Sequence, residues 1–190
     1  MQYTSLIGHF IDVAWIAMII VWIVTMFSAK KTARKAAAGP WILFRVAFVV
    51  IIYLLIRYTN AENIVVNYYI HEPLIEWIGV ICVYVGITIA IWARFYLGRN
   101  WGMPMTEKEG AELVTTGPYA YIRNPIYTGI LLAITGSALS LGLLWVIILI
   151  PYLIYLIPSV FVEEKIMLKL FPDTYPAYKA RTKRLIPWIW

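Results

Sequence analysis

The chain has 190 residues, of which 62% are hydrophobic and only 14% are charged, and its formal net charge is +6. Soluble domains carry about 25% charged residues, so the composition excludes a disordered chain and an ordinary soluble enzyme. With Cys82 as the one cysteine, it also excludes an intrachain disulfide. We expect a polytopic, all-α integral membrane protein. We assign the positive charge to loops beside the membrane and expect no binding to nucleic acid.

Five membrane-spanning helices are predicted, because a spanning helix needs about 20 apolar residues to cross about 30 Å of hydrocarbon. The first three are expected at residues 6–29, 41–58 and 74–97. Residues 125–162 contain no charged side chain, and one straight helix of that length would reach about 57 Å. The stretch must therefore fold back. The reversal is expected around residues 140–142, which gives spans four and five.

Small residues and prolines indicate how the last two spans are shaped. Gly129 and Gly136 in span four predict a close approach to a neighbouring helix. Pro151 and Pro158 predict kinks in span five.

The distribution of charge predicts the orientation in the membrane. The loop at residues 59–73 contains no lysine or arginine but holds Glu62 and Glu72. The other loops and the tail are basic, with Lys30, Lys31, Arg34, Lys35, Arg99, Lys108, Arg123, Lys165, Lys169, Lys179, Arg181, Lys183 and Arg184. The positive-inside rule then places the N-terminus outside and the C-terminus in the cytoplasm.

Two polar segments, residues 98–124 and 163–190, adjoin the cytoplasmic ends of spans three, four and five. We therefore expect them to form one cytoplasmic cap. The chain divides accordingly into residues 1–97, which hold the first three spans, and residues 98–190, which form a core of loop, helical hairpin and tail.

The first polar segment ends in a predicted helix start. Gly117-Pro118-Tyr119 predicts a turn, and Asn124 followed by Pro125 is typical of an N-cap and the first helical position. Such a helix start favours anions, and Arg123 adds a fixed positive charge beside it. A capped helix with an interfacial arginine explains the same residues, so this pattern leaves both interpretations open.

The second polar segment begins with Glu163 and Glu164, directly after an apolar span. These carboxylates are either solvated helix ends, or one of them faces inward and holds a cation or accepts a proton. Residues 171–175 are expected to break the helix, and a short helix is expected to follow through Tyr178 and to end near residues 182–187. Arg184 either snorkels to the interface or clamps a carboxylate or phosphate. Two histidines and one cysteine on separate elements predict no metal site.

Together the two segments resemble the isoprenylcysteine carboxyl methyltransferase family, which is related to phospholipid methyltransferases. The resemblance covers residues 95–187. Asn124 stands where many members have histidine, and Gly102 stands where a serine is common. The matching positions are Leu97, Gly98, Trp101, Leu113, Val114, Gly117, Pro118, Tyr119, Arg123, Asn124, Pro125, Tyr127, Gly129, Glu163, Glu164, Phe171, Tyr175, Tyr178, Thr182, Arg184 and Pro187.

The resemblance implies a membrane-embedded methyltransferase that uses S-adenosylmethionine and contains no metal. By residue types, one glutamate would bind the cofactor's ammonium, and Arg123 with the helix start would bind its carboxylate. The tyrosines would stack on the adenine or face the sulfonium. The resemblance implies cofactor binding by Leu113, Val114, Gly117, Tyr119, Arg123, Asn124, Pro125, Tyr127, Glu163 and Glu164, and we expect catalytic roles for Arg184, Glu163 and Glu164.

The expected acceptor is a lipophilic or prenylated molecule from the membrane, most of all an isoprenylcysteine-type carboxylate that Arg184 orients. A phospholipid amine and a lipophilic thiol are alternative acceptors. Two different classes stay open: an NADPH-dependent enzyme of the sterol-reductase type, and a non-enzymatic transport or scaffold protein. The sequence fixes neither the oligomeric state nor which of Glu163 and Glu164 faces the cofactor.

Overall fold

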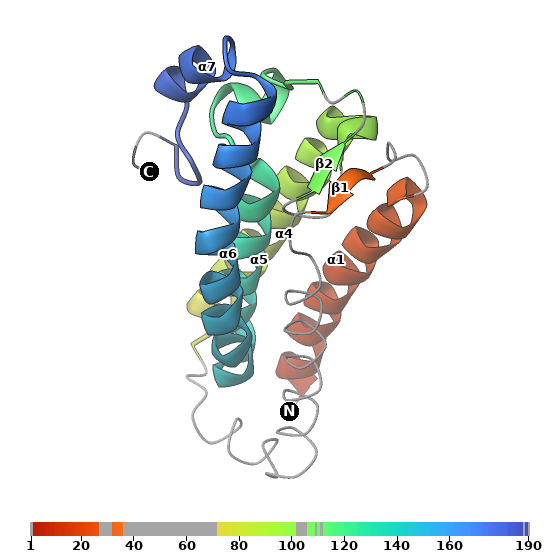
Figure 1. The fold of residues 1–190 in the computed structure, drawn as a ribbon. Helices are drawn as coiled ribbons and strands as arrows, with labels where there is room; N and C mark the ends of the chain where they lie inside the picture. The colour runs from red at the N-terminus through yellow and green to blue at the C-terminus, as the bar shows by residue number, and fades with distance from the viewer. Residues whose placement is uncertain are drawn as a thin grey trace.

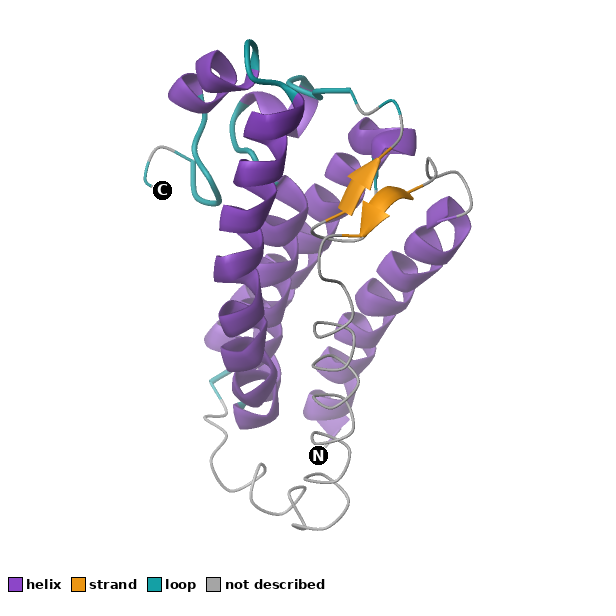
Figure 2. Cartoon of the chain, in the orientation of Figure 1, coloured by secondary structure: helices purple, strands orange, loops and turns teal. Residues whose placement is uncertain are grey.

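The structure is a computed structural model that describes residues 2–26, 32–35, 72–101, 106–108, 110, 112–187 and 189. Five α-helices make up most of this part (Figure 2): α1 (Gln2–Met26), α4 (Pro73–Leu97), α5 (Pro125–Leu141), α6 (Leu143–Leu170) and α7 (Tyr175–Arg181). Two short 3-10 turns, η1 (Gly98–Asn100) and η2 (Gly117–Ala120), precede α5. The predicted span at residues 41–58 lies outside the described residues.

Three of these helices are long and apolar enough to cross a membrane, at Leu6–Thr25, Pro73–Asn100 and Trp145–Leu170, and α5 is a shorter apolar helix. The predicted helical membrane protein is thus confirmed in its main feature. One short antiparallel pair, β1 (Thr32–Lys35) with β2 (Thr106–Lys108), was not predicted.

The reversal between spans four and five falls where it was expected. α5 ends at Leu141, α6 begins at Leu143, and Gly142 between them has a φ of 83°. This left-handed backbone conformation favours glycine, which has no Cβ to clash.

Helix α6 extends beyond the predicted fifth span. It runs through Pro151 and Pro158 and continues past Val162 to Leu170. Glu163 and Glu164 follow the apolar span but lie within the last turns of the helix, which ends where the break at residues 171–175 was predicted. The added residues include glutamate, lysine, methionine and leucine, which are strong helix formers.

Glycines bring α4 and α5 into direct backbone contact. A Cβ added to Gly86 would lie 2.4 Å from the Gly129 carbonyl oxygen, and one added to Gly79 would lie 2.5 Å from that of Gly136. The predicted close approach at Gly129 and Gly136 is thus confirmed, and the partner helix is α4. Such small-residue interfaces are typical of helices in membranes.

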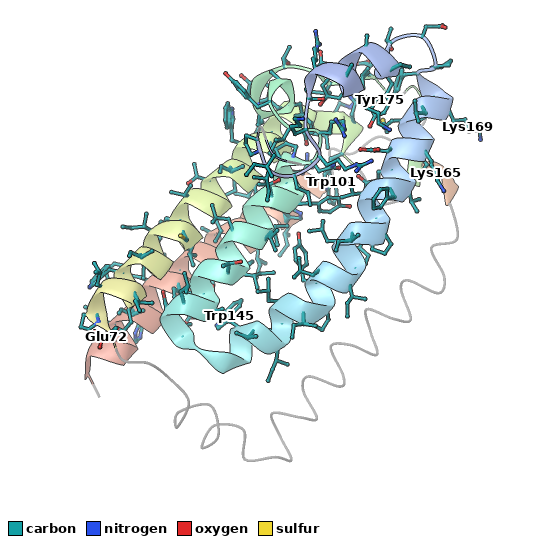
Figure 3. The ribbon with its side chains drawn as sticks, turned by 90° about the vertical axis from the view of Figure 1, so that its left-hand side faces the viewer. Glu72, Trp101, Trp145, Lys165, Lys169 and Tyr175 are labelled. Atoms are coloured by element: carbon teal, nitrogen blue, oxygen red, sulfur yellow. The ribbon has the colours of Figure 1, made fainter. Side chains whose placement is uncertain are left out.

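Helices α1, α4 and α6 run in one direction and α5 runs in the opposite direction (Figure 1). Trp15 on α1 donates a hydrogen bond to Ser137 Oγ on α5 at 3.1 Å, and its ring stacks on Trp145 of α6. The strand pair lies at the end of the bundle that carries α7 (Figure 1). Trp101 and Tyr175 lie at this same end, whereas Glu72 and Trp145 lie at the other (Figure 3).

Candidate active site

Three segments meet at the α7 end of the bundle: the start of α5, the last turns of α6, and the tail that follows α7. The tail pairs with the residues before α5 through a parallel bridge between Ile122 and Lys183. The Arg123 amide donates to the Lys183 carbonyl at 2.7 Å, and the Asn124 amide donates to the Arg184 carbonyl at 3.1 Å. This pairing fixes Arg184 beside the start of α5, although 60 residues separate it from Asn124.

Asn124 occupies the predicted N-cap position of α5 with Pro125 as the first helical residue, but its side chain does not cap the helix. The amide nitrogen Nδ2 instead donates to the Arg184 carbonyl at 3.0 Å. The Asn124 carbonyl accepts from the backbone and the hydroxyl of Thr128, each at 3.1 Å. The start of α5 was therefore predicted correctly. The Asn124 side chain, however, binds the tail and does not cap the helix.

Glu164 is the centre of a charged cluster. Its Oε1 accepts from Arg123 Nη2 and Arg184 Nε, both at 2.8 Å, and its Oε2 lies 3.0 Å from Lys179 Nζ. The Glu164 side chain is only 6% exposed. Three cations surround one buried carboxylate, so this cluster carries a surplus of positive charge.

Arg123 connects that cluster to α7. Its Nη1 donates to the carbonyls of Lys179 and Thr182 at the C-terminal end of α7, while Nε and Nη2 bind Glu164. The last carbonyls of a helix lack partners within it, and the guanidinium satisfies two acceptors there. Arg123 is predicted from the sequence to bind a cofactor carboxylate, but all three of its side-chain nitrogens donate to protein groups.

Arg184 is held on two sides. Its Nε and Nη2 donate to Glu164, and its guanidinium lies over the Phe161 ring at 4.6 Å from the centroid. Hydrogen bonding to Glu164 raises the pKa of Arg184, so the group stays charged. Because its side chain is 24% exposed, against 7% for Arg123, Arg184 is the more accessible of the two guanidinium groups.

Glu163 has a different environment from its neighbour. Its Oε1 accepts a hydrogen bond of 2.5 Å from the Tyr127 hydroxyl on α5. Tyr152 on α6 donates to the Tyr127 carbonyl at 3.3 Å. These contacts join the first turn of α5 to α6 beneath the charged cluster, in a setting rich in tyrosine.

The predicted turn at Gly117-Pro118-Tyr119 forms η2, which packs on the end of α4. Gly117 has a φ of 59°, a backbone conformation that favours glycine. A Cβ at this position would also lie only 2.4 Å from the Tyr96 ring, so there is no space for a side chain. Tyr178 of α7 donates to the Tyr119 carbonyl at 2.7 Å. Burial, and next the charge of Glu163, raise the pKa of Tyr119, which therefore stays a neutral phenol.

The structure thus brings Tyr119, Tyr127, Glu163, Glu164 and Arg184 to one end of the bundle. Leu113 and Val114 lie half-buried in the segment that leads into η2. Lys179, whose ammonium pairs with Glu164, was missed as a candidate. Its place on the last turn of a short helix gives no sequence signal for a partner 15 residues earlier. Among the described residues, no group of three or more metal-ligating side chains occurs.

These features define a helical membrane protein with a charged, tyrosine-rich site at one end of its bundle. Residues 74–174, more than half of the chain, match the phospholipid methyltransferase family. The chain therefore belongs to this family of membrane methyltransferases, which confirms the resemblance seen in the sequence. It is also 32% identical over 75 residues to the uncharacterized protein YpbQ of Bacillus subtilis (strain 168), and this match covers 39% of the chain and 43% of that protein.

Proposed function

We propose that this chain transfers a methyl group from S-adenosylmethionine to a lipophilic acceptor, and that the acceptor presents a carboxylate of the isoprenylcysteine type. The observation that carries the proposal is that two adjacent carboxylates have different binding partners. Glu163 is bound by the Tyr127 hydroxyl, whereas Glu164 is bound by three cations. One half of the site thus favours positively charged ligand groups and the other half favours negatively charged ones.

The side chains of the site match the chemical groups of S-adenosylmethionine, which carries an ammonium, a sulfonium and a carboxylate. A carboxylate beside aromatic rings suits the two cations, and Glu163 with Tyr127 supplies this combination. The partly exposed Lys179 suits the carboxylate. We assign the ammonium to Glu163, whose Oε1 also accepts the hydrogen bond from the Tyr127 hydroxyl. The family resemblance adds Leu113, Val114, Gly117 and Pro125 to the cofactor side.

The charge around Glu164 supports an anionic acceptor. Arg123, Arg184 and Lys179 surround it, and Glu163 supplies the only other carboxylate that we place in the site. A carboxylate is attracted to such a surplus of positive charge, whereas the ammonium of a phospholipid headgroup is repelled.

When bound, S-adenosylmethionine supplies an electrophilic methyl group on its sulfonium. A carboxylate oxygen is already deprotonated and needs no general base, so the acceptor half of the site has to orient it. Arg184 performs this role as a partly exposed guanidinium whose direction Glu164 and Phe161 fix. An amine acceptor would instead need a group to accept its proton.

We assign the α7 end of the bundle to the cytoplasm. Arg99, Arg123, Lys165, Lys169 and Arg184 lie in the segments that meet there, and such an excess of basic residues marks cytoplasmic loops. The cofactor then enters from the cytoplasm, and the lipophilic part of the acceptor lies in the membrane beside α5 and α6.

Binding and transfer assays on the detergent-purified chain test this function. Calorimetry should show binding of S-adenosylhomocysteine but not of NADPH, which would indicate the reductase class. Radiolabelled methyl groups should move to a farnesylcysteine analogue faster than to phosphatidylethanolamine or a lipophilic thiol. Transfer to phosphatidylethanolamine alone would overturn the assigned acceptor, and binding of neither nucleotide would overturn the proposed function.

A further inference from the structure

Arg94 is a buried charge at the α7 end of the bundle that the proposed function does not use. It lies in the last turn of α4 and is 1% exposed. Its Nη1 donates to the Gly98 carbonyl at 2.8 Å, and its Nη2 donates to the Thr25 carbonyl at 2.6 Å. Its Nε has no hydrogen-bond partner, and none of the described carboxylates forms an ion pair with it.

The two carbonyls explain how a guanidinium is tolerated there. Thr25 lies in the last turn of α1, and Gly98 directly follows α4. The C-terminal end of a helix carries unpaired carbonyls and a partial negative charge of roughly half an elementary unit. Arg94 therefore neutralises two helix ends at once and ties α1 to α4. A lysine has a single ammonium and no planar fork with which to span both acceptors in this way.

Two further contacts lie at the same end of α4, and the second of them joins this helix end to η2. The guanidinium lies over the Trp101 ring at 4.5 Å from the centroid, and Trp101 begins the segment that leads towards η2. Two residues after Arg94, the Tyr96 ring fills the space that a side chain at position 117 would need. Arg94 also lies close enough to Tyr119 that its charge opposes the rise in the pKa of that phenol.

We propose that Arg94 is a positioning residue. It holds the end of α4, where the Tyr96 ring packs on Gly117, to Trp101 and to the end of α1, and thereby fixes η2 with Tyr119. It acts through Trp101 and the end of α4 and does not itself touch cofactor or acceptor. The inference rests on the proposed function for its effect on cofactor affinity. Its effect on the mobility of η2 is independent of any ligand.

The test compares Arg94→Gln and Arg94→Lys with Trp15→Phe in the full chain. Trp15→Phe removes the hydrogen bond to Ser137, which ties α1 to α5 but has no contact with η2. Deuterium uptake of the backbone around residues 112–122 should rise in both Arg94 variants and stay unchanged in Trp15→Phe. The KM for S-adenosylmethionine should rise about tenfold in both Arg94 variants, with a kcat close to that of the wild type.

A double-mutant cycle gives a second readout. If Arg94 acts through Trp101, the effects of Arg94→Gln and Trp101→Leu on uptake around residues 112–122 should be far from additive. Unchanged uptake in Arg94→Gln, or a rise of the same size in Trp15→Phe, would overturn the positioning role. Absence of S-adenosylhomocysteine binding in the wild type would instead overturn the proposed function. The deuterium uptake alone would then show whether Arg94 positions η2.

Discussion

Tyr127 and Glu163 are joined by a hydrogen bond of 2.5 Å, which the tyrosine hydroxyl donates to Oε1 of the carboxylate. The bond links the first turn of α5 to the last turns of α6. It holds one acidic side chain in a fixed direction among neutral phenols. The neighbouring carboxylate of Glu164 forms ion pairs with Arg123, Lys179 and Arg184.

Replacing Tyr127 with phenylalanine should weaken cofactor binding by about tenfold, because a hydrogen bond to a charged group contributes about 1.5–3 kcal/mol. The ring and its packing remain, so the protein should still fold. Calorimetric titration with S-adenosylhomocysteine measures the change. Tyr152→Phe is the matched control, since Tyr152 donates to the Tyr127 backbone rather than to Glu163. Equal losses in both variants would contradict the role of the Tyr127 hydroxyl.

Replacing Glu164 with glutamine should mainly destabilise the protein. The change leaves Arg123, Arg184 and Lys179 without their shared counter-charge, and breaking a buried ion pair costs about 3–5 kcal/mol. The midpoint of thermal unfolding in detergent measures this loss. In Glu163→Gln the midpoint should change much less, while binding of S-adenosylhomocysteine falls. A larger drop in the midpoint for Glu163→Gln would reverse our assignment of the two carboxylates.

Local patterns predicted much of the fold. The uncharged run at residues 125–162 is too long for one crossing, and the reversal follows at Gly142. The start of α5 follows from Asn124-Pro125, because proline fixes a helical φ and needs no amide partner. These features depend only on neighbouring residues and on the thickness of a membrane.

The tertiary contacts of the site could not be predicted in the same way. The side chain of Asn124 binds the tail rather than capping its helix, and Lys179 reaches Glu164 from another helix. Both contacts depend on how the tail folds back over α5, which no local pattern encodes.

Replacing Arg184 with lysine should lower kcat by about 100-fold, because lysine keeps the positive charge but loses the planar guanidinium that orients a carboxylate. The affinity for S-adenosylhomocysteine should stay within about twofold of the wild-type value. Initial rates of methyl transfer to a farnesylcysteine analogue measure this effect. Lys179→Ala removes a more exposed cation of the same cluster and should reduce kcat far less. A drop in cofactor affinity with an unchanged kcat in Arg184→Lys would show that Arg184 binds the cofactor and does not orient the acceptor.

Adding a methyl group at Gly86 or Gly129 should destabilise the bundle. In each variant the new Cβ would meet a backbone carbonyl oxygen at 2.4 Å, so α4 and α5 have to separate, at a cost of about 3 kcal/mol. Thermal unfolding in detergent measures the effect. Gly8→Ala is the control, because a Cβ there meets no atom within 4 Å, and alanine favours a helix interior over glycine by roughly 0.5–1 kcal/mol. Similar midpoints for all three variants would contradict the close packing of α4 on α5.

Alkaline pH should loosen α7 through Tyr178, whose hydroxyl donates to the Tyr119 carbonyl at 2.7 Å. Burial raises the pKa of Tyr178 to about 12, so the unfolded chain releases this proton first, near its ordinary pKa of about 10. The contribution of Tyr178 to stability is therefore fully present below about pH 10 and is lost as the pH rises towards 12.

Thermal unfolding midpoints across this range should fall less steeply in Tyr178→Phe, which at neutral pH loses about 1 kcal/mol for the missing hydrogen bond. Tyr121→Phe, at an exposed position, should follow the wild type. An equally steep fall in Tyr178→Phe would show that other groups control the alkaline transition.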